Sequence, residues 1–154
     1  MTTIYLTDYV IMAGDLQLSL PQFLSKHKYH KIAVLVDRNT RKRCLPRIQE
    51  ILDHYEHHII VVPAGESCKN IDTCKHIWNE LFDQGFNRND LMLNLGGGVV
   101  GDMGGFCAST FKRGMDFAQV PTTLLAQVDA SIGGKLGIDF EQVKNGVGLF
   151  KNPR

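Results

Sequence analysis

Six glycines fall within ten positions of the segment 94–110, "NLGGGVVGDMGGFCAST", which also holds one carboxylate, Asp102. Glycine costs roughly 1 kcal/mol relative to alanine inside a helix, so helix stability does not explain the cluster. Gly96, Gly98 and Gly101 match G-x-G-x-x-G, a pattern in which missing side chains let a diphosphate approach main-chain N–H groups at a helix start. Asp102 would repel a phosphate but can accept hydrogen bonds from ribose hydroxyls or a carboxamide. The segment therefore favours a whole dinucleotide, NAD, over a bare phosphate.

Close packing of a helix on a sheet is the alternative explanation for small residues in this segment. We favour cofactor binding for Gly96 to Gly101, including Gly97, and packing for Gly104 and Gly105. The pattern also departs from the usual fingerprint, which follows the first strand and precedes its ribose-binding acid. Here the glycines follow the third strong apolar run, and the candidate acid, Asp37, lies upstream. No Gly-Lys-Ser/Thr sequence is present, which disfavours a P-loop hydrolase.

More polar side chains stand out in the glycine-rich second half of the chain. An acid within "LLAQVDASIGG", Asp129, needs a polar partner if that segment is a buried helix. Basic groups nearby would suit a phosphorylated substrate. The candidates for this second site are Arg113, Asp129, Lys135, Lys144 and Asn145. A surface turn before Gly146 is the alternative for Lys144 and Asn145, and exposed loop charges are the alternative for Glu66 and Lys69.

Apolar runs of strand length must position these groups. Such runs predict strands at 31–37, 57–62, 90–95 and 116–121. Helical spacing of apolar residues predicts helices over about 40–53 and from about 70 to 85, with Asn70 or Asp72 as N-cap and Gly85 as C-terminal cap. The segment 124–134 is expected to form a third helix, made of small residues.

This alternation predicts the α/β class, a Rossmann-like parallel sheet with helices on both faces. Ligands of such sheets bind beyond the carboxyl ends of the strands. Three segments lie there: 37–40, 64–69 and the glycine cluster.

Bulk composition limits the partners. The chain has 154 residues, 44% hydrophobic, and a formal net charge of +1, which argues against nucleic acid as a partner. No apolar run approaches membrane-span length, and no signal peptide is recognisable, so we expect no membrane association and a cytoplasmic protein. Four cysteines without a C-x-x-C pair are expected to be reduced thiols. Six histidines without ligand spacing predict no metal site within the chain.

Four ordered motifs together resemble the 3-dehydroquinate synthase family. They are "AGESCK", "LGGGVVGDMGGFCASTFKRG", "VPTTLLAQVDASIGGK" and "KNGVGLF", and the resemblance runs from about residue 4 to residue 153. The resemblance implies an enzyme that converts 3-deoxy-arabino-heptulosonate 7-phosphate to 3-dehydroquinate and phosphate in the shikimate pathway. It also implies a recycled NAD, a divalent metal (zinc or cobalt) and a homodimer.

Residue by residue, the resemblance implies where these groups would bind. Positions that match NAD contacts are Asp37, Gly65, Glu66, Lys69, Gly97, Gly98, Gly101, Asp102, Thr122 and Thr123. Positions that match the nicotinamide and substrate end are Asp129, Lys135, Lys144 and Asn145. Arg113 matches an arginine that reaches the substrate phosphate of the neighbouring subunit.

The chain differs from members of this family in its length. Family members are about twice as long, and their metal ligands come from a C-terminal helical domain that has no counterpart in residues 1–154. We therefore expect an NAD-binding domain without turnover of its own. The alternatives are a sister sugar-phosphate cyclase, a metal-dependent alcohol or glycerol dehydrogenase, and a non-catalytic NAD-binding module.

Overall fold

A four-stranded parallel sheet forms the centre of the molecule. The computed structural model describes residues 4–7, 10–12 and 15–154. The strands of the sheet are β3 (Lys31–Asp37), β4 (Glu56–Val62), β5 (Leu91–Gly96) and β6 (Asp116–Pro121), in the spatial order β4-β3-β5-β6. All four lie within one residue of the segments that the apolar runs predict. The predicted α/β class is confirmed.

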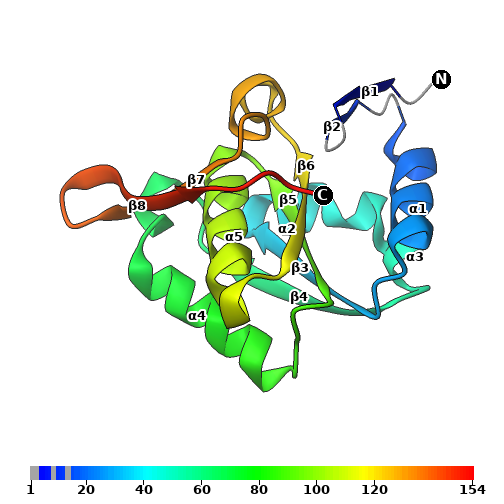
Figure 1. Ribbon diagram of the computed structural model, residues 1–154, viewed down its shortest axis with the longest axis horizontal. Helices are drawn as coiled ribbons and strands as arrows, with labels where there is room; N and C mark the ends of the chain where they lie inside the picture. The colour runs from blue at the N-terminus through cyan, green and yellow to red at the C-terminus, as the bar shows by residue number, and fades with distance from the viewer. Residues whose placement is uncertain (1–3, 8–9, 13–14) are drawn as a thin grey trace.

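Helices cover both faces of this sheet (Figure 1). On one face lie α4 (Ile71–Asp83) and α5 (Gly98–Thr110), which pack on alternate residues of the strands, such as Leu35 and Met92. On the other face lie α1 (Leu16–His27) and α3 (Gln49–Leu52), which cover the intervening residues, such as Val34 and Leu93. The short helix α2 (Arg38–Arg43) follows β3 directly. Period-two burial on both faces explains why each strand reads as a continuous apolar run.

The prediction of one continuous helix over 40–53 is wrong. The segment forms α2, a short 3-10 turn η1 (Leu45–Arg47), and α3. Pro46 stands in the middle, and proline lacks the N–H that a continuous helix would need there. By contrast, α4 begins as predicted, with the Asn70 side chain accepting from Thr73 N at 3.0 Å, and Gly85 follows its end with a φ of 70°.

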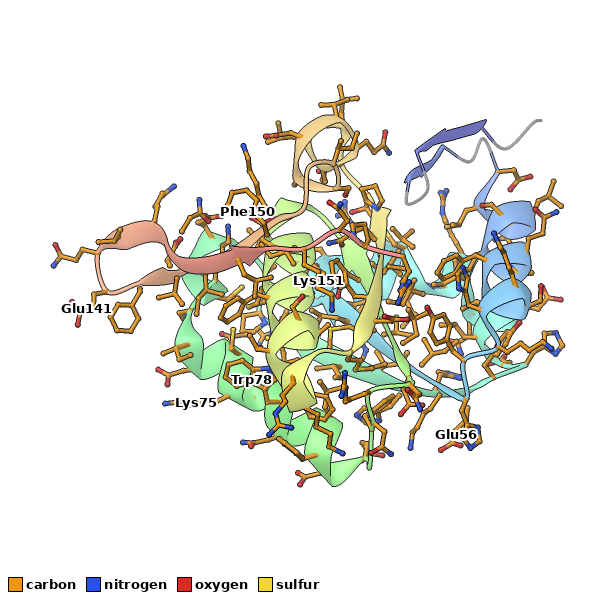
Figure 2. All side chains as sticks on the ribbon, viewed as in Figure 1. Glu56, Lys75, Trp78, Glu141, Phe150 and Lys151 are labelled. Carbon is orange, nitrogen blue, oxygen red and sulfur yellow. The ribbon has the colours of Figure 1, made fainter. Side chains whose placement is uncertain are left out.

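Two antiparallel hairpins stand outside the central sheet. One joins β1 (Ile4–Thr7) to β2 (Val10–Met12), and the other joins β7 (Lys135–Phe140) to β8 (Val143–Phe150). Figure 1 shows the second hairpin projecting beyond α4 and α5, and Figure 2 shows Glu141 near its tip. Three further turns connect the body: η2 (Glu66–Cys68), η3 (Phe111–Arg113) and the π-helical turn η4 (Ala126–Ala130). The chain is helical over 124–130, so the helix predicted over 124–134 is confirmed in its first part and ends before Ser131.

The packing role predicted for Gly104 and Gly105 is borne out by their neighbours. A Cβ on Gly104 would overlap the buried side chain of Asn94 and lie 2.7 Å from Leu35 Cδ2. A Cβ on Gly105 would overlap Leu136 and lie 3.2 Å from Phe117 Cε2. These glycines let α5 lie directly on β5 and β7.

We predict that Gly104→Ala lowers the free energy of unfolding by about 2 kcal/mol, because the methyl group has no space beside Asn94. Chemical denaturation of the two proteins measures the difference. Gly133→Ala is a control for the loss of a glycine, since a Cβ at position 133 would meet nothing within 4 Å and only the φ of 92° opposes the change. A Gly104→Ala protein as stable as the wild type would contradict the packing account.

Candidate functional site

The strand order creates a crevice between β3 and β5. The chain leaves β3 toward β4 on one side and leaves β5 toward β6 on the other side, so the order reverses between β3 and β5. Ligands of open α/β sheets bind outside the carboxyl ends of the strands at such a reversal. Asp37 ends β3 and the glycine cluster follows β5, so both lie at this crevice. The reversal explains why the glycines follow the third strong apolar run rather than the first.

The first turn of α5 lies open toward this crevice. Its N-cap residue is Gly97, and no side chain caps the helix there. A Cβ on Gly98 would lie 3.4 Å from Ala130 Cβ, which is ordinary contact. Uncapped N–H groups and the positive end of a helix dipole are what a diphosphate requires. This turn therefore fits the diphosphate of a dinucleotide.

Two glycines of the pattern are needed for packing as well. A Cβ on Gly96 would lie 2.5 Å from Val100 Cβ, and a Cβ on Gly101 would lie 3.0 Å from Gln119 Oε1. Gln119 Nε2 also donates to the carbonyl of Gly101 at 3.1 Å and so ties the first turn of α5 to β6. Gly101 thus has a structural role beside the cofactor role predicted for it, and Gln119 was missed by the sequence reasoning.

Asp37 caps α2 with one of its carboxylate oxygens. Asp37 Oδ1 accepts from Asn39 N at 2.7 Å and from Thr40 N at 2.8 Å. The Thr40 hydroxyl in turn accepts from Asp37 N at 3.0 Å, which completes a capping box. This box fixes the carboxylate at the crevice, and Oδ2 is not used by the cap.

The segment 64–69 contributes a charged side chain, Lys69, to the site. Gly65 has a φ of 102°, a conformation that favours glycine, and it leads into the turn η2 that contains Glu66. Lys69 follows this turn and is buried, with only 5% of its side chain exposed. Lys69 Nζ lies 2.6 Å from Asp102 Oδ2 and 2.7 Å from Asn145 Oδ1. The exposed-loop alternative for Lys69 is therefore wrong.

Asp102 titrates in an unusual environment. Burial raises the pKa of Asp102 above its ordinary value, although the hydrogen bond and positive charge of Lys69 act in the opposite direction. The negative charges of Glu66 and Asp129 raise this pKa further. The positive charge of Lys69 therefore partly offsets the effect of burial on the pKa of Asp102.

A polar hollow of about 550 Å³ gathers several of the predicted residues. Its polar lining comes from Asp102, Asp129, Lys135 and Asn145, which lie on α5, η4, β7 and β8. The Asp129 side chain is exposed, so the polar partner expected for a buried acid is not needed. Glycine residues and Phe150 form much of the remaining wall.

The threonines Thr122 and Thr123 connect the glycine cluster to η4. Thr122 N donates to the carbonyl of Gly96 at 2.9 Å, which extends the pairing of β5 with β6. The Thr123 hydroxyl accepts from Ala126 N at 3.2 Å and caps the turn that follows. A Cβ on Gly97 would contact Thr123 Cγ2 at 3.4 Å. Both threonines therefore lie beside the open turn of α5.

Two predicted site residues lie apart from this group. Lys144 is exposed on β8 and does not line the polar hollow. Arg113 lies just before β6 begins, at the opposite end of the sheet, with a φ of 69°. The expectation that Arg113 joins Asp129 in one site within a single chain is therefore wrong. Glycine follows at 114, which helps the chain to turn sharply there.

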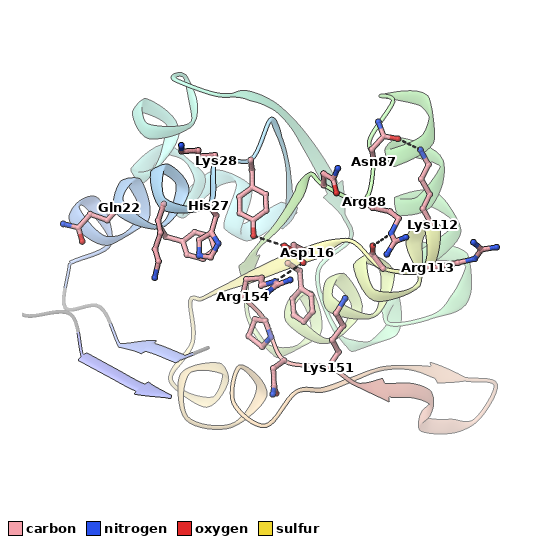
Figure 3. A pocket seen from close by; sticks show the side chains of 18 of the residues that line it. Gln22, His27, Lys28, Asn87, Arg88, Lys112, Arg113, Asp116, Lys151 and Arg154 are labelled. Atoms are coloured by element: carbon pink, nitrogen blue, oxygen red, sulfur yellow. Dashed lines mark hydrogen bonds and ion pairs between the residues drawn. The ribbon is translucent and has the colours of Figure 1, made fainter. Parts of the chain in front are cut away.

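Arg113 instead borders a second, basic hollow of about 1420 Å³ (Figure 3). Its walls come from α1, the segment 87–89, η3 and the last residues of the chain. Positive side chains predominate, and the acid among the lining residues, Asp116, is already bound by Tyr29 Oη and Arg154 Nε, each at 3.1 Å. Burial and the charge of Asp116 raise the pKa of Tyr29, so its hydroxyl remains a donor.

Within the described residues, 4–7, 10–12 and 15–154, the structure has no group of three or more His, Cys, Asp or Glu side chains that could hold a metal ion. The four cysteines are free thiols. No helix in the same part of the chain has the length and hydropathy needed to cross a membrane.

Comparison with known proteins finds a matching family model and similar sequences. The family model "3-dehydroquinate synthase N-terminal" matches residues 59–154. A 3-dehydroquinate synthase from Parabacteroides distasonis is 44% identical over 144 residues, which cover 94% of this chain and 41% of that protein. One from Pyrococcus furiosus is 45% identical and covers 94% of this chain and 42% of that protein. The chain therefore spans about two fifths of the length of these relatives.

Solved structures of cyclases share the fold. A 2-deoxy-scyllo-inosose synthase, solved with carbaglucose-6-phosphate, NAD+ and Co2+, has a TM-score of 0.83 at 25% identity, covering 88% of this chain and 38% of that one. ValA, a 2-epi-5-epi-valiolone synthase from Streptomyces hygroscopicus with NAD+ and Zn2+ bound, has the same TM-score and identity, covering 99% and 43%. A probable glycerol dehydrogenase from Sinorhizobium meliloti scores 0.67 at 20% identity, covering 92% and 36%, and shows likeness of fold alone.

Proposed function

This chain belongs to the 3-dehydroquinate synthase family, and we propose that it forms the NAD-binding domain of an enzyme that makes 3-dehydroquinate and phosphate from 3-deoxy-arabino-heptulosonate 7-phosphate. The observation that carries the proposal is the uncapped first turn of α5 beside Asp37 at the reversal of strand order. The free thiols support a cytoplasmic location.

The proposed cofactor contacts follow from the crevice. The N–H groups of the first turn of α5, at Gly98 and after, hold the diphosphate. Asp37 Oδ2 accepts from ribose hydroxyls, while its Oδ1 remains in the cap of α2. The threonines Thr122 and Thr123 line the cofactor site from the other side. When bound, NAD supplies transient hydride acceptance from a substrate hydroxyl.

At the nicotinamide end, the polar hollow holds the reacting part of the substrate. The Asp102 carboxylate, held by the Lys69 ammonium at 2.6 Å, can accept from the cofactor. Lys135 offers a cation, and Asp129 offers an exposed carboxylate that can serve in acid–base catalysis. Lys144 joins them only if the exposed β8 hairpin moves toward the hollow or another chain segment closes over it.

The remaining requirements lie outside residues 1–154. A divalent metal, zinc or cobalt, would act as a Lewis acid on the substrate, with ligands from a C-terminal helical domain of the longer protein. Arg113 would bind the substrate phosphate of a second subunit in a homodimer, which agrees with its position away from the polar hollow. The isolated chain is then a binding domain without turnover.

The fate of NAD tests the proposed activity in the full-length protein. With substrate, catalytic amounts of NAD and a divalent metal, we expect phosphate release with no net NADH, since the cofactor is recycled. Phosphate assay and absorbance at the NADH band measure the two products. NADH that accumulates in proportion to substrate would instead identify an alcohol or glycerol dehydrogenase.

A sister cyclase is the second candidate, because the structures that share this fold include inosose and valiolone synthases. The two candidates differ in the sugar phosphate that they turn over. Release of phosphate from a seven-carbon acidic sugar phosphate favours the first candidate. Release from glucose 6-phosphate, whose carba analogue is bound in the inosose synthase structure, favours the second.

A further inference from the structure

The β7–β8 hairpin is irregular beside the polar hollow. Ile138 pairs with Val147, and the next pair along the ladder is Phe140 with Val143. Asp139 alone on β7 therefore lies opposite three residues of β8, at 144–146. Extra residues in one strand leave backbone groups unpaired and re-aim side chains, a feature that recurs beside active sites.

A closed circuit of hydrogen bonds fills this irregularity. Asn145 N donates to Asp139 Oδ1 at 2.8 Å, and Asp139 N donates to the carbonyl of Lys69 at 2.8 Å. Lys69 Nζ then donates to Asn145 Oδ1 at 2.7 Å. The circuit joins β7, β8 and the segment after η2, and the same Lys69 Nζ also contacts Asp102 on α5. The Asp139 carboxylate accepts from Asn145 N and makes no hydrogen bond of its own to the Lys69 side chain within this circuit.

Asn145 needs this support because of its backbone. Its φ is 51°, in the left-handed region, which asparagine tolerates better than most residues but which still costs energy relative to glycine. The residue is also exposed, so no surrounding core holds it in place. A charged acceptor for its N–H offsets the cost and fixes the direction of the side chain.

We propose that Asp139 is a positioning residue, which holds Asn145 in its left-handed conformation so that Asn145 Oδ1 meets the ammonium of Lys69. The inference deepens the proposed function, on which it rests, because Asn145 lines the polar hollow and Lys69 donates to two of its lining residues, Asn145 and Asp102. Asp139 touches neither substrate nor cofactor in this account. It acts through Asn145, by keeping Lys69 in one place between Asn145 and Asp102.

Two variants of Asp139 separate geometry from charge. Asp139→Asn retains a side-chain oxygen that can accept from Asn145 N, whereas Asp139→Ala removes the acceptor. On the 154-residue chain without ligand, we expect hydrogen exchange of the Asn145 amide to quicken roughly tenfold in Asp139→Ala and to stay within about threefold of the wild type in Asp139→Asn. Equal exchange in all three proteins would overturn the proposal.

Kinetics of the full-length enzyme supply the second readout. We expect Asp139→Ala to lower kcat by roughly tenfold or more with the Kd for NAD changed less than about twofold, and Asp139→Asn to restore most of kcat. Equal loss of kcat in both variants would contradict a positioning role through the Asn145 amide. So would an unchanged kcat in Asp139→Ala with a lowered Tm, which is what a purely structural turn would give. A full-length wild-type protein that shows the protected Asn145 amide but lacks cyclase activity would reject the proposed function and leave the hydrogen-bond circuit intact.

Discussion

Replacing Lys69 with methionine is expected to lower the free energy of unfolding by about 3 kcal/mol near neutral pH. Methionine retains the length of the buried side chain but removes the charge that lies 2.6 Å from Asp102 Oδ2. Both partners are largely buried, with 5% and 21% of their side chains exposed, so water replaces little of the lost interaction. Denaturant titration of both proteins measures the difference.

The loss should depend on pH in a defined direction. Burial already raises the pKa of Asp102, and removal of Lys69 raises it further. The folded variant then binds a proton more readily than the unfolded chain, so its stability falls as pH rises above the carboxyl pKa of the unfolded chain. We expect a larger deficit at about pH 8 than at about pH 5. The double variant Lys69→Met, Asp102→Asn should lose this dependence, and a deficit independent of pH in the single variant would contradict the account.

Gly98→Val is expected to weaken NAD binding at least roughly 100-fold, about 2.7 kcal/mol. A branched side chain at the first residue of α5 would cover the uncapped N–H groups that we assign to the diphosphate. Calorimetric titration of the folded variant measures the affinity, and circular dichroism verifies the fold.

Two other variants serve as controls for Gly98→Val. The methyl group of Gly98→Ala would lie 3.4 Å from Ala130 Cβ, so the fold tolerates it and the loss of affinity should be smaller. Gly104→Ala is expected to destabilise the protein while leaving the affinity of its folded fraction unchanged, because Gly104 faces Asn94 rather than the crevice. Wild-type affinity in Gly98→Val would remove the diphosphate assignment.

The sequence predicted the parallel strands well because they are buried on both faces, which leaves uninterrupted apolar runs such as 31–37 and 57–62. It wrongly predicted one continuous helix across Pro46, because the missing N–H of this proline outweighs the apolar spacing. The helix predicted over 124–134 ends at 130, because small residues alone do not show where a helix ends. The strand order, and with it the crevice, depends on contacts between distant segments.

The close packing of α5 was predictable because it demands glycine, as at Gly104 and Gly105. The site was less predictable, because it depends on pairing between distant residues. Lys69 and Asn145 are 76 positions apart, and Asp139 entered no motif, yet one hydrogen-bond circuit joins all three. The odd register of the β7–β8 hairpin, which no periodicity in "KLGIDFEQVKNGVGLF" reveals, brings them together.

Titration of the 154-residue chain with NAD, without metal or substrate, tests the central claim most directly. The account predicts saturable heat at about one equivalent, because the uncapped turn of α5, Asp37 and the two threonines belong to this chain alone. The same titration should raise Tm in the wild type and not in Gly98→Val. A folded chain that gives no heat and no shift in Tm at saturating NAD would contradict the claim that these residues form a dinucleotide site.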